Sequence, residues 1–367
     1  MSSLRQRALE ASKRTPWQRV ADSPVTKYYT DWAAFEKALL GEGELTYERP
    51  SGDWDLVLGP CGAAYNYDID ETLLDIRSSR LYAEHIARLE GAHILEAKGT
   101  TRIALCSPAG ASWASQHLTV NVPPGEEADI VVYAPRRAPG STGVEVRVKE
   151  GARASLLVIG DPGPGAPTAY LLRRAVGVRA SLSSLVMTSQ SAMVRIDEQT
   201  TMAALSSLRH SSITLALSNA RVDDVIDTVQ EGRSSKADVW GFGVASDESL
   251  VSVRGTAVML PNSEGSSSRF FVEALLIGRG ARAYTMPMMR IETGNVEVAS
   301  HRSAQYRLPL DELFYLETRG LTQEEATELI VLGRLQSLVE ASGIPKQLTE
   351  LASERLAKYA KEALGGA

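Results

Sequence analysis

Side chains that could bind a metal ion are few and scattered along this sequence. The five histidines are His85, His93, His117, His210 and His301, and none lies four residues from another or beside a cysteine. A mononuclear zinc site draws on several such ligands at characteristic spacings, so the pattern does not support one. For the first four histidines we expect a surface position or a hydrogen-bonded structural role.

Carboxylates and thiols that could act together are also sparse. Asp223, Asp224 and Asp227 form one carboxylate cluster, but on a strand only alternate residues share a face, so solvent-facing loop residues are favoured over a catalytic set. Cys61 and Cys106 are too few for a disulfide framework and lack CxxC spacing. We interpret each cysteine as a small buried hydrophobic residue without chemistry of its own.

The sequence lacks the motifs of nucleotide and hydrolytic chemistry. There is no GxxxxGK[ST], and Gly241-Phe242-Gly243 is not followed by the third glycine of a dinucleotide fingerprint. Neither GxSxG nor HExxH is present. The Gly-Pro run from Asp161 to Pro167 is interpreted as a loop between strands. We therefore expect that the chain hydrolyses no nucleotide itself.

Composition and charge narrow the class of protein further. A net charge of -6 and a pI near 5.6 argue against a nucleic-acid partner bound through its phosphates. No apolar run approaches the ~20 residues that cross a bilayer, so we expect no membrane association. The stretch from Met1 to Leu9 has no apolar core of a secretory signal, which predicts a cytoplasmic protein.

The sequence divides into three regions, and their folds determine where the candidate residues lie. Residues 1–92 mix short helical spacings with short alternating runs. Residues 93–308 form a train of short strands rich in Val, Ile, Leu, Thr and Ser, with Gly or Asn between them. The segment Gly-Ala-Arg-Ala recurs after Glu150 and after Arg279, and such recurrence favours stacked coils over a large β-sandwich. The predicted fold is mainly β: a right-handed parallel β-helix with N-terminal helices and a C-terminal α-helical domain.

The C-terminal domain, residues 309–367, follows a three-to-four-residue apolar period. Thr322 and Glu325 have the spacing of a capping box, which satisfies free amide groups at a helix start. Gly320 and the Gly343-Ile344-Pro345 segment predict helix breaks on either side. The last predicted helix is Gln347 to Leu364.

Three successive segments resemble the SufB/SufD family of iron-sulfur cluster assembly (SUF) proteins. They are Met286-Pro287-Met288-Met289-Arg290-Ile291-Glu292, then Val296-Glu297-Val298-Ala299-Ser300-His301, then Phe314-Tyr315-Leu316-Glu317-Thr318-Arg319-Gly320-Leu321. In that family a strand ending in His is followed by a Phe-Tyr-Leu-x-x-Arg-Gly block and an acidic helix. The resemblance covers about Lys236 to Arg334 and implies a non-catalytic scaffold subunit, not an enzyme.

Departures from the family pattern favour the SufD side. SufB proteins carry a Cys before the Leu-Leu-Ile strand and a Glu after the His, and these positions are Val272 and Arg302 here. Valine cannot ligate iron and a guanidinium is permanently cationic. The resemblance implies that His301 is a candidate iron or cluster ligand at a partner interface. No stably bound cofactor is expected, only a transient iron-sulfur cluster shared with a partner subunit.

The resemblance also implies protein partners. These are a SufC-type ABC ATPase and a SufB-type paralogue, or a second copy of this chain in a dimer. The residues expected to bind the partner are Phe314, Tyr315, Leu316, Arg319, Gly320, Leu321, Glu324, Glu325, Ala326 and Gly333. Two alternatives stay open at this point: a self-associating SufB/SufD-like homodimer, and a carbohydrate-active β-helix enzyme that uses Asp224.

Overall fold

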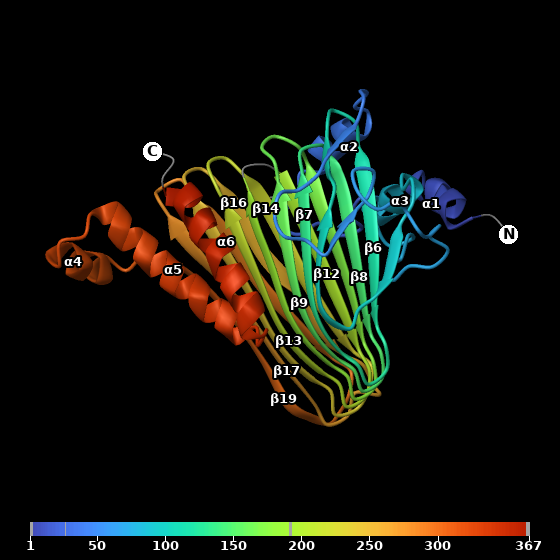
Figure 1. Cartoon of the computed structure of the whole chain (residues 1–367). Coiled ribbons are helices and arrows are strands. Elements are labelled where there is room, and N and C mark those ends of the chain that lie inside the picture. The colour runs from blue at the N-terminus through green and yellow to red at the C-terminus, as the bar shows by residue number, and fades with distance from the viewer. Residues whose placement is uncertain (1–2, 26, 191–192, 365–367) are drawn as a thin grey trace.

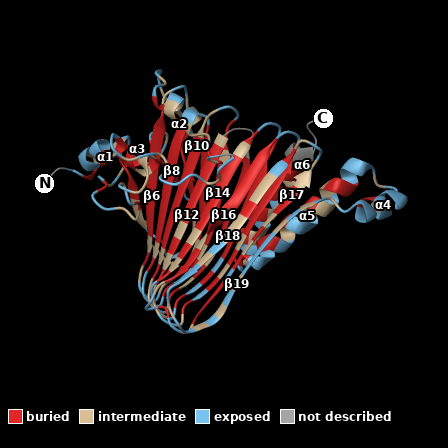
Figure 2. Cartoon of the chain, turned by 180° about the vertical axis from the view of Figure 1, so that it is seen from behind, coloured by how far each residue is buried: buried red, intermediate tan, exposed pale blue. Residues whose placement is uncertain are grey.

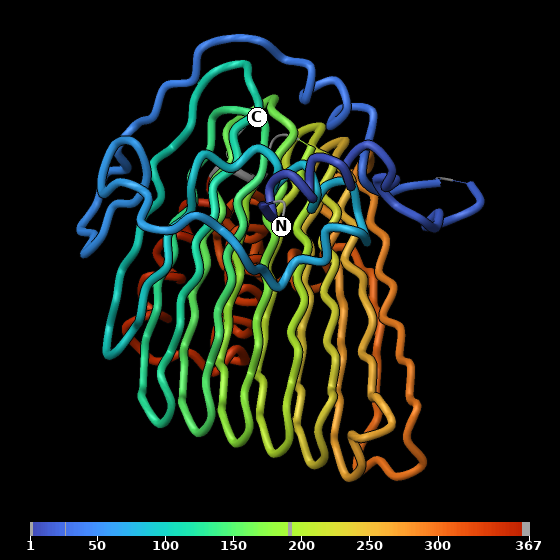
Figure 3. Tube along the Cα trace, turned by 90° about the vertical axis from the view of Figure 1, so that its right-hand side faces the viewer, coloured from blue at the N-terminus to red at the C-terminus, as the bar shows by residue number. Residues whose placement is uncertain are grey.

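Two long parallel sheets dominate the computed structural model, which describes residues 3–25, 27–190 and 193–364. Successive strands alternate between the sheets, so the chain winds as a coil whose rungs stack along one axis (Figure 3). Because neighbouring strands within each long sheet run parallel, the predicted parallel β-helix is confirmed and the sandwich is excluded.

The strands fall into two named sheets and one short pair. The first sheet contains β3 (His93–Glu96), β6 (Ala114–Val122), β8 (Gly140–Val148), β10 (Thr168–Val176), β12 (Met193–Met202), β14 (Arg221–Gln230), β16 (Leu250–Met259) and β18 (Arg282–Ile291). The second contains β2 (Leu56–Leu58), β4 (Gly99–Leu105), β7 (Glu127–Arg136), β9 (Arg153–Pro162), β11 (Ser181–Gln190), β13 (Ser207–Ala216), β15 (Lys236–Ser246), β17 (Ser266–Ile277) and β19 (Val296–Arg307). The strands β1 (Thr46–Glu48) and β5 (Ser107–Ala109) pair antiparallel beside the coil.

The core of the coil is built by every second residue of each strand. On β8 the inward positions are Val144, Val146 and Val148, and on β9 they include Leu156 and Val158, all buried in one continuous cluster. Side chains of a strand alternate between its faces, so a period of two is what places these residues inside. Each rung therefore covers the apolar interior of the rung before it.

One edge of the coil is a stack of turns that share the left-handed backbone conformation. The residues with positive φ in these turns are Gly125, Gly151, Arg179, Leu205, Ser234 and Gly265. Their amides bond to the next turn, as in Gly151 N to Val178 O and Leu205 N to Arg233 O, both 2.9 Å. The turn edge thus carries a hydrogen-bonded ladder of its own.

Replacing Leu205 with glycine is expected to stabilise the protein. Leu205 has φ +60° and is half exposed, so the mutation removes backbone strain and little packing. We expect the free energy of unfolding to rise by up to about 1 kcal/mol, measured by urea denaturation. Ala203→Gly in the same turn, where φ is not positive, serves as the control and should destabilise. A loss of stability in Leu205→Gly would contradict the strain argument.

The N-terminal helices cover one flank of the coil. Helices α1 (Leu4–Ser12), α2 (Trp32–Leu39) and α3 (Arg80–Ala87) lie over the first sheet (Figure 1), where Phe35, Leu81 and Ile86 pack with Trp113 and Leu171. At the first rung, the Asn66 carboxamide bonds both the amide and the carbonyl of Ile94, as a further strand would. Part of the β3 edge at this end is therefore occupied.

The two cysteines form a disulfide, so the interpretation of each as a free buried residue is wrong. Cys61 and Cys106 have Cα atoms 5.8 Å apart and are joined through their sulfurs. Cys106 follows β4 directly, while Cys61 lies in the loop after β2, the neighbour of β4 in the second sheet. Their separation of 45 residues gave no sign of this pairing, because the coil brings the two segments together.

The C-terminal helices cover the other flank. Helices α5 (Gln323–Ala341) and α6 (Lys346–Leu364) pack on the second sheet, with Val331, Leu335 and Leu348 against Ile213 and Leu215. The predicted capping box of Thr322 and Glu325 is present. In the described part of the chain, none of the helices combines the length and apolar character that crossing a bilayer requires.

Candidate functional site

The last rung of the coil is open. Strands β18 and β19 are the terminal strands of the two sheets, and each has one neighbour within its sheet. Most residues of the earlier strands are buried, whereas most residues of β18 and β19 are partly or fully exposed (Figure 2). An uncovered strand edge presents backbone amides and carbonyls that can pair with another chain. In the described structure the two ends of the coil therefore differ, since Asn66 occupies part of the edge at the first rung.

The inner face changes character at this rung. The inward residues of β17 are apolar: Phe270, Val272 and Ala274. Their register partners on β19 are His301, Ser303 and Gln305. These side chains bond across the coil to β18: Ser303 Oγ lies 2.6 Å from Thr285 Oγ1, and Gln305 Nε2 donates to the same oxygen at 3.1 Å. The apolar core thus ends one rung before the strands do.

His301 is exposed, and a hydrogen bond to the neighbouring strand orients its imidazole. Its Nδ1 lies 3.1 Å from the carbonyl oxygen of Pro287 on β18. A carbonyl only accepts, so Nδ1 donates, and in the neutral imidazole Nε2 then keeps its lone pair. This is how a metal-binding histidine is commonly held by its surroundings. Within the described ranges, no three or more His, Cys, Asp or Glu side chains gather closely enough to hold a metal ion.

Arg302 points away from this imidazole, whereas Val272 shares its face of the coil. Strand alternation places Arg302 on the outer face, where it forms an ion pair with Glu273 (2.5 Å) and stacks over Phe271. Its charge is therefore turned away from His301. Val272 is fully buried inside the coil.

Helix α4 (Leu310–Thr318) projects from the body at the open end (Figure 1). It exposes 68% of Phe314 and 56% of Tyr315 to solvent, and Leu310 is exposed as well. Arg319 stacks on Tyr315 with its guanidinium 5.1 Å from the ring centroid. Exposed aromatic and arginine side chains on one short helix are typical of a protein-binding anchor.

The other residues expected to bind the partner are distributed less uniformly. Leu316 and Leu321 are half buried, and Gly320 ends α4 with a φ of +97°. Glu324 and Gly333 are exposed on α5. Glu325 closes the helix cap and Ala326 is fully buried, so both have a structural role in the folded chain.

The carboxylate cluster is not on a loop, and its interpretation as solvent-facing is wrong. Asp223 and Asp224 lie on β14, are completely buried, and point to opposite faces. Asp224 points inside, where Ser212 donates to it at 2.7 Å and burial raises its pKa. Asp223 points outward and pairs with Arg195 (2.6 Å) and Arg254 (2.9 Å). No accessible carboxylate groove, as in a polysaccharide-cleaving β-helix, is formed by this cluster.

Sequence reasoning missed this buried ion network on the outer face of the first sheet. Arg195 and Asp223 are register partners on neighbouring strands, 28 residues apart. Arg173 joins through Asp197 (3.0 Å). The available signal was a charged residue that recurs after about the number of residues in one rung. That number varies from rung to rung, so the sequence alone did not show which charged residues are neighbours.

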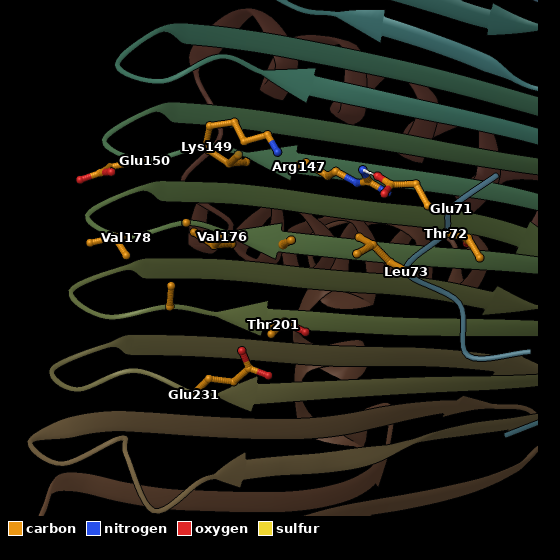
Figure 4. Close-up of a pocket in the computed structure, with 14 residues that line it drawn as sticks. Glu71, Thr72, Leu73, Arg147, Lys149, Glu150, Val176, Val178, Thr201 and Glu231 are labelled. Carbon is orange, nitrogen blue, oxygen red and sulfur yellow. Dashed lines mark hydrogen bonds and ion pairs between the residues drawn. The ribbon is translucent and has the colours of Figure 1, made fainter. Parts of the chain in front are cut away.

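A cavity of about 560 Å³ lies on the first sheet beside the segment from Glu71 to Leu73 (Figure 4). Arg147 and Glu71 point toward each other across it and form an ion pair. At the turn edge, Glu150 pairs with Arg179. Arg147, Glu71 and Glu150 are thus already paired, and we assign no ligand to this cavity.

The fold is a parallel β-helix with a polar last rung and a projecting helix. The family model described as SUF system FeS cluster assembly, SufBD core domain, matches residues 105–334, more than half of the chain. The chain therefore belongs to the SufBD family, as its resemblance indicated.

Relatives in other organisms carry the same family description. A SufBD family protein of Synechocystis sp. is 26% identical over 122 residues, 33% of this chain and 25% of the relative. One of Methanothermobacter thermautotrophicus is 30% identical over 131 residues, covering 34% and 30%. The matched segments thus span about a quarter to a third of these relatives' length.

Proposed function

We propose that this chain is a SufD-like, non-catalytic scaffold subunit of an iron-sulfur cluster assembly complex. The observation that carries the proposal is the open last rung, where uncovered strand edges meet a polar inner face that contains His301. A SufB-type paralogue would add its own last rung here by backbone pairing. The family match supports membership of the assembly system, and the open end supports the pairing.

His301 would donate one ligand to a cluster held mainly by the partner. Its Nε2 lone pair is free, and a neutral imidazole is a sound ligand for iron. Without a neighbouring thiolate, one histidine cannot hold a cluster alone, so the cluster is cargo that passes between subunits. Val272 is an inert neighbour in this scheme.

Helix α4 would dock a SufC-type ABC ATPase. Phe314 and Tyr315 supply exposed aromatic surface, and Arg319 holds the Tyr315 ring in place. The helix joins α5, which packs on the second sheet. Movement of the ATPase would therefore be passed to the coil through α5.

A cytoplasmic location completes the proposal. Disulfides are uncommon in the cytosol, and we propose that the Cys61–Cys106 bond opens there by exchange with cellular thiols. Neither cysteine lies near the open rung or α4, because both belong to the opposite end of the coil. The assembly role does not require the bond.

Co-expression with a SufB-type and a SufC-type protein tests the role of His301. In the purified complex, His301→Ala is expected to lower recovered iron and sulfide roughly tenfold, because a ligand is lost. Its exposure predicts unchanged stability and unchanged subunit recovery. Gln305→Ala, on the same inner face but without a metal-binding nitrogen lone pair, is the matched control and should retain the cluster.

Other outcomes separate the alternatives. If the intact chain recovers neither partner, and alone has twice its monomer mass in solution, the self-associating homodimer replaces the heterodimer. If truncation before Pro309 leaves ATPase recovery unchanged, the docking role of the C-terminal helices fails. If the complexes of the wild type and of His301→Ala contain equal amounts of iron, His301 is not a cluster ligand.

A further inference from the structure

A second cavity lies between the second sheet and α5, close to the open end. It measures about 580 Å³, and a neighbouring hollow of about 430 Å³ shares Tyr306, Arg334 and Ser337 with it. Pockets for small molecules commonly occupy 300–1,000 Å³, so the space suits a compact ligand.

The floor of this cavity is a register of outward side chains on three neighbouring strands. Trp240 on β15 and Arg302 on β19 line the cavity and lie on either side of Phe271 on β17, which contacts both without lining it. One row further, Phe242 lies beside Glu273. The result is an aromatic floor with one cation, Arg302, already neutralised by Glu273 at 2.5 Å.

Two polar side chains, Tyr306 and Arg334, face the cavity and lie against each other. The Oη atom of Tyr306 is buried and forms no hydrogen bond in the described structure. Burial raises the pKa of Tyr306, so the phenol keeps its proton and can donate. Arg334 stacks on the Tyr306 ring at 5.6 Å, and the ion pairs of the described residues include none for it. A buried polar group without a partner is costly, and a bound acceptor would relieve that cost.

We propose that this cavity binds a small organic anion. Its carboxylate or phosphate would accept hydrogen bonds from Arg334 and Tyr306 Oη, and its apolar or planar body would lie on Trp240 and Phe242. An arginine held flat on an aromatic ring is pre-organised to bind such an oxyanion. The first cavity lacks this feature, since its Arg147 is occupied by Glu71. The inference requires no partner protein and stands apart from the proposed assembly role.

Titration of the purified full chain with phenyl phosphate tests the site. We expect saturable one-to-one binding by calorimetry. Inorganic phosphate supplies only the anionic group and benzyl alcohol only the aromatic ring, so each should bind far more weakly. Arg334→Gln should weaken binding at least about tenfold, and Tyr306→Phe about fivefold. Phenylacetate in parallel distinguishes carboxylate from phosphate ligands.

Arg319→Gln is the matched control, because Arg319 also stacks on a tyrosine but lies outside the cavity. It should bind phenyl phosphate as the wild type does. The proposal is overturned if neither phenyl phosphate nor phenylacetate saturates by about 10 mM, or if Arg334→Gln binds undiminished. Equal binding of inorganic phosphate would overturn the role of the aromatic floor. Arg334 is exposed and Tyr306→Phe is conservative, so both variants should fold.

Discussion

Alanine at both Phe314 and Tyr315 is expected to abolish stable capture of a SufC-type ATPase. The two rings are 68% and 56% exposed, so they contribute little to the fold. Buried aromatic anchors contribute about 2 kcal/mol or more each at an interface, so the double variant should bind at least about 100-fold more weakly. Surface plasmon resonance on the immobilised chain measures the change in Kd.

Stability and a distant apolar substitution control for this result. The double variant should unfold within about 0.5 kcal/mol of the wild type, because neither ring is buried in the core. Leu40→Ala removes a 77% exposed apolar side chain at the other end of the molecule and should leave ATPase binding unchanged. If the double variant binds the ATPase as tightly as the wild type, the docking surface does not lie on α4.

Removal of the Asp223 carboxylate is expected to cost about 3–5 kcal/mol of unfolding free energy. Asp223 is fully buried and accepts from Arg195 (2.6 Å), Arg254 (2.9 Å) and Thr30 (2.6 Å). Asp223→Ala would leave both guanidinium groups without this partner in a buried site. It would also release the N-terminal segment that carries Thr30. Urea denaturation gives the change.

A surface ion pair provides the matched comparison. Asp238 and Arg269 are 3.0 Å apart but about half exposed. Such a pair contributes about 0–1 kcal/mol, so Asp238→Ala should be nearly neutral. Equal effects of the two aspartate substitutions would show that burial does not set the strength of the Asp223 network.

The same network makes stability depend on acidity. Burial alone would raise the pKa of Asp197, but Arg195 and Arg173 outweigh it and hold that pKa at about 2. Likewise Arg254 and Arg195 outweigh burial and hold the pKa of Asp223 well below its ordinary value. Folded pKa values below the unfolded ~3.9 mean that this stability is fully present above about pH 5 and is lost as pH falls toward 2. Asp223→Ala should flatten that acid decline.

Much of the fold could be predicted because its causes are local. Alternation of apolar residues placed the strands, and Thr322 with Glu325 marked the start of α5. The recurring Gly-Ala-Arg-Ala segment was a less direct guide. Its first copy begins at Gly151, in a turn from the first sheet to the second, whereas the copy at Gly280 lies in a turn from the second sheet to the first. The copies therefore mark the coil but not equivalent positions in it.

Candidate site residues could be predicted only where they lie close together in the sequence. His301 and the residues of α4 lie within the short sequence segments that resemble the SufB/SufD family. Trp240, Phe271 and Arg302 become neighbours because each follows the last by one rung, and the pairing is visible only once the register is known. The Cys61–Cys106 bond and the Asp223 network were missed for the same reason, since sequence spacing does not report which rungs stack.

The unlike ends of the coil also limit how large an assembly can become. A solenoid with two uncovered ends could add copies head to tail without limit and form a fibre. Here the Asn66 side chain bonds the amide and carbonyl of Ile94 at the first rung, whereas β18 and β19 end their sheets without a further strand, which favours strand addition at β18 and β19. Two chains that meet end to end would use up both free edges. A pair joined in this way would not extend readily into a fibre.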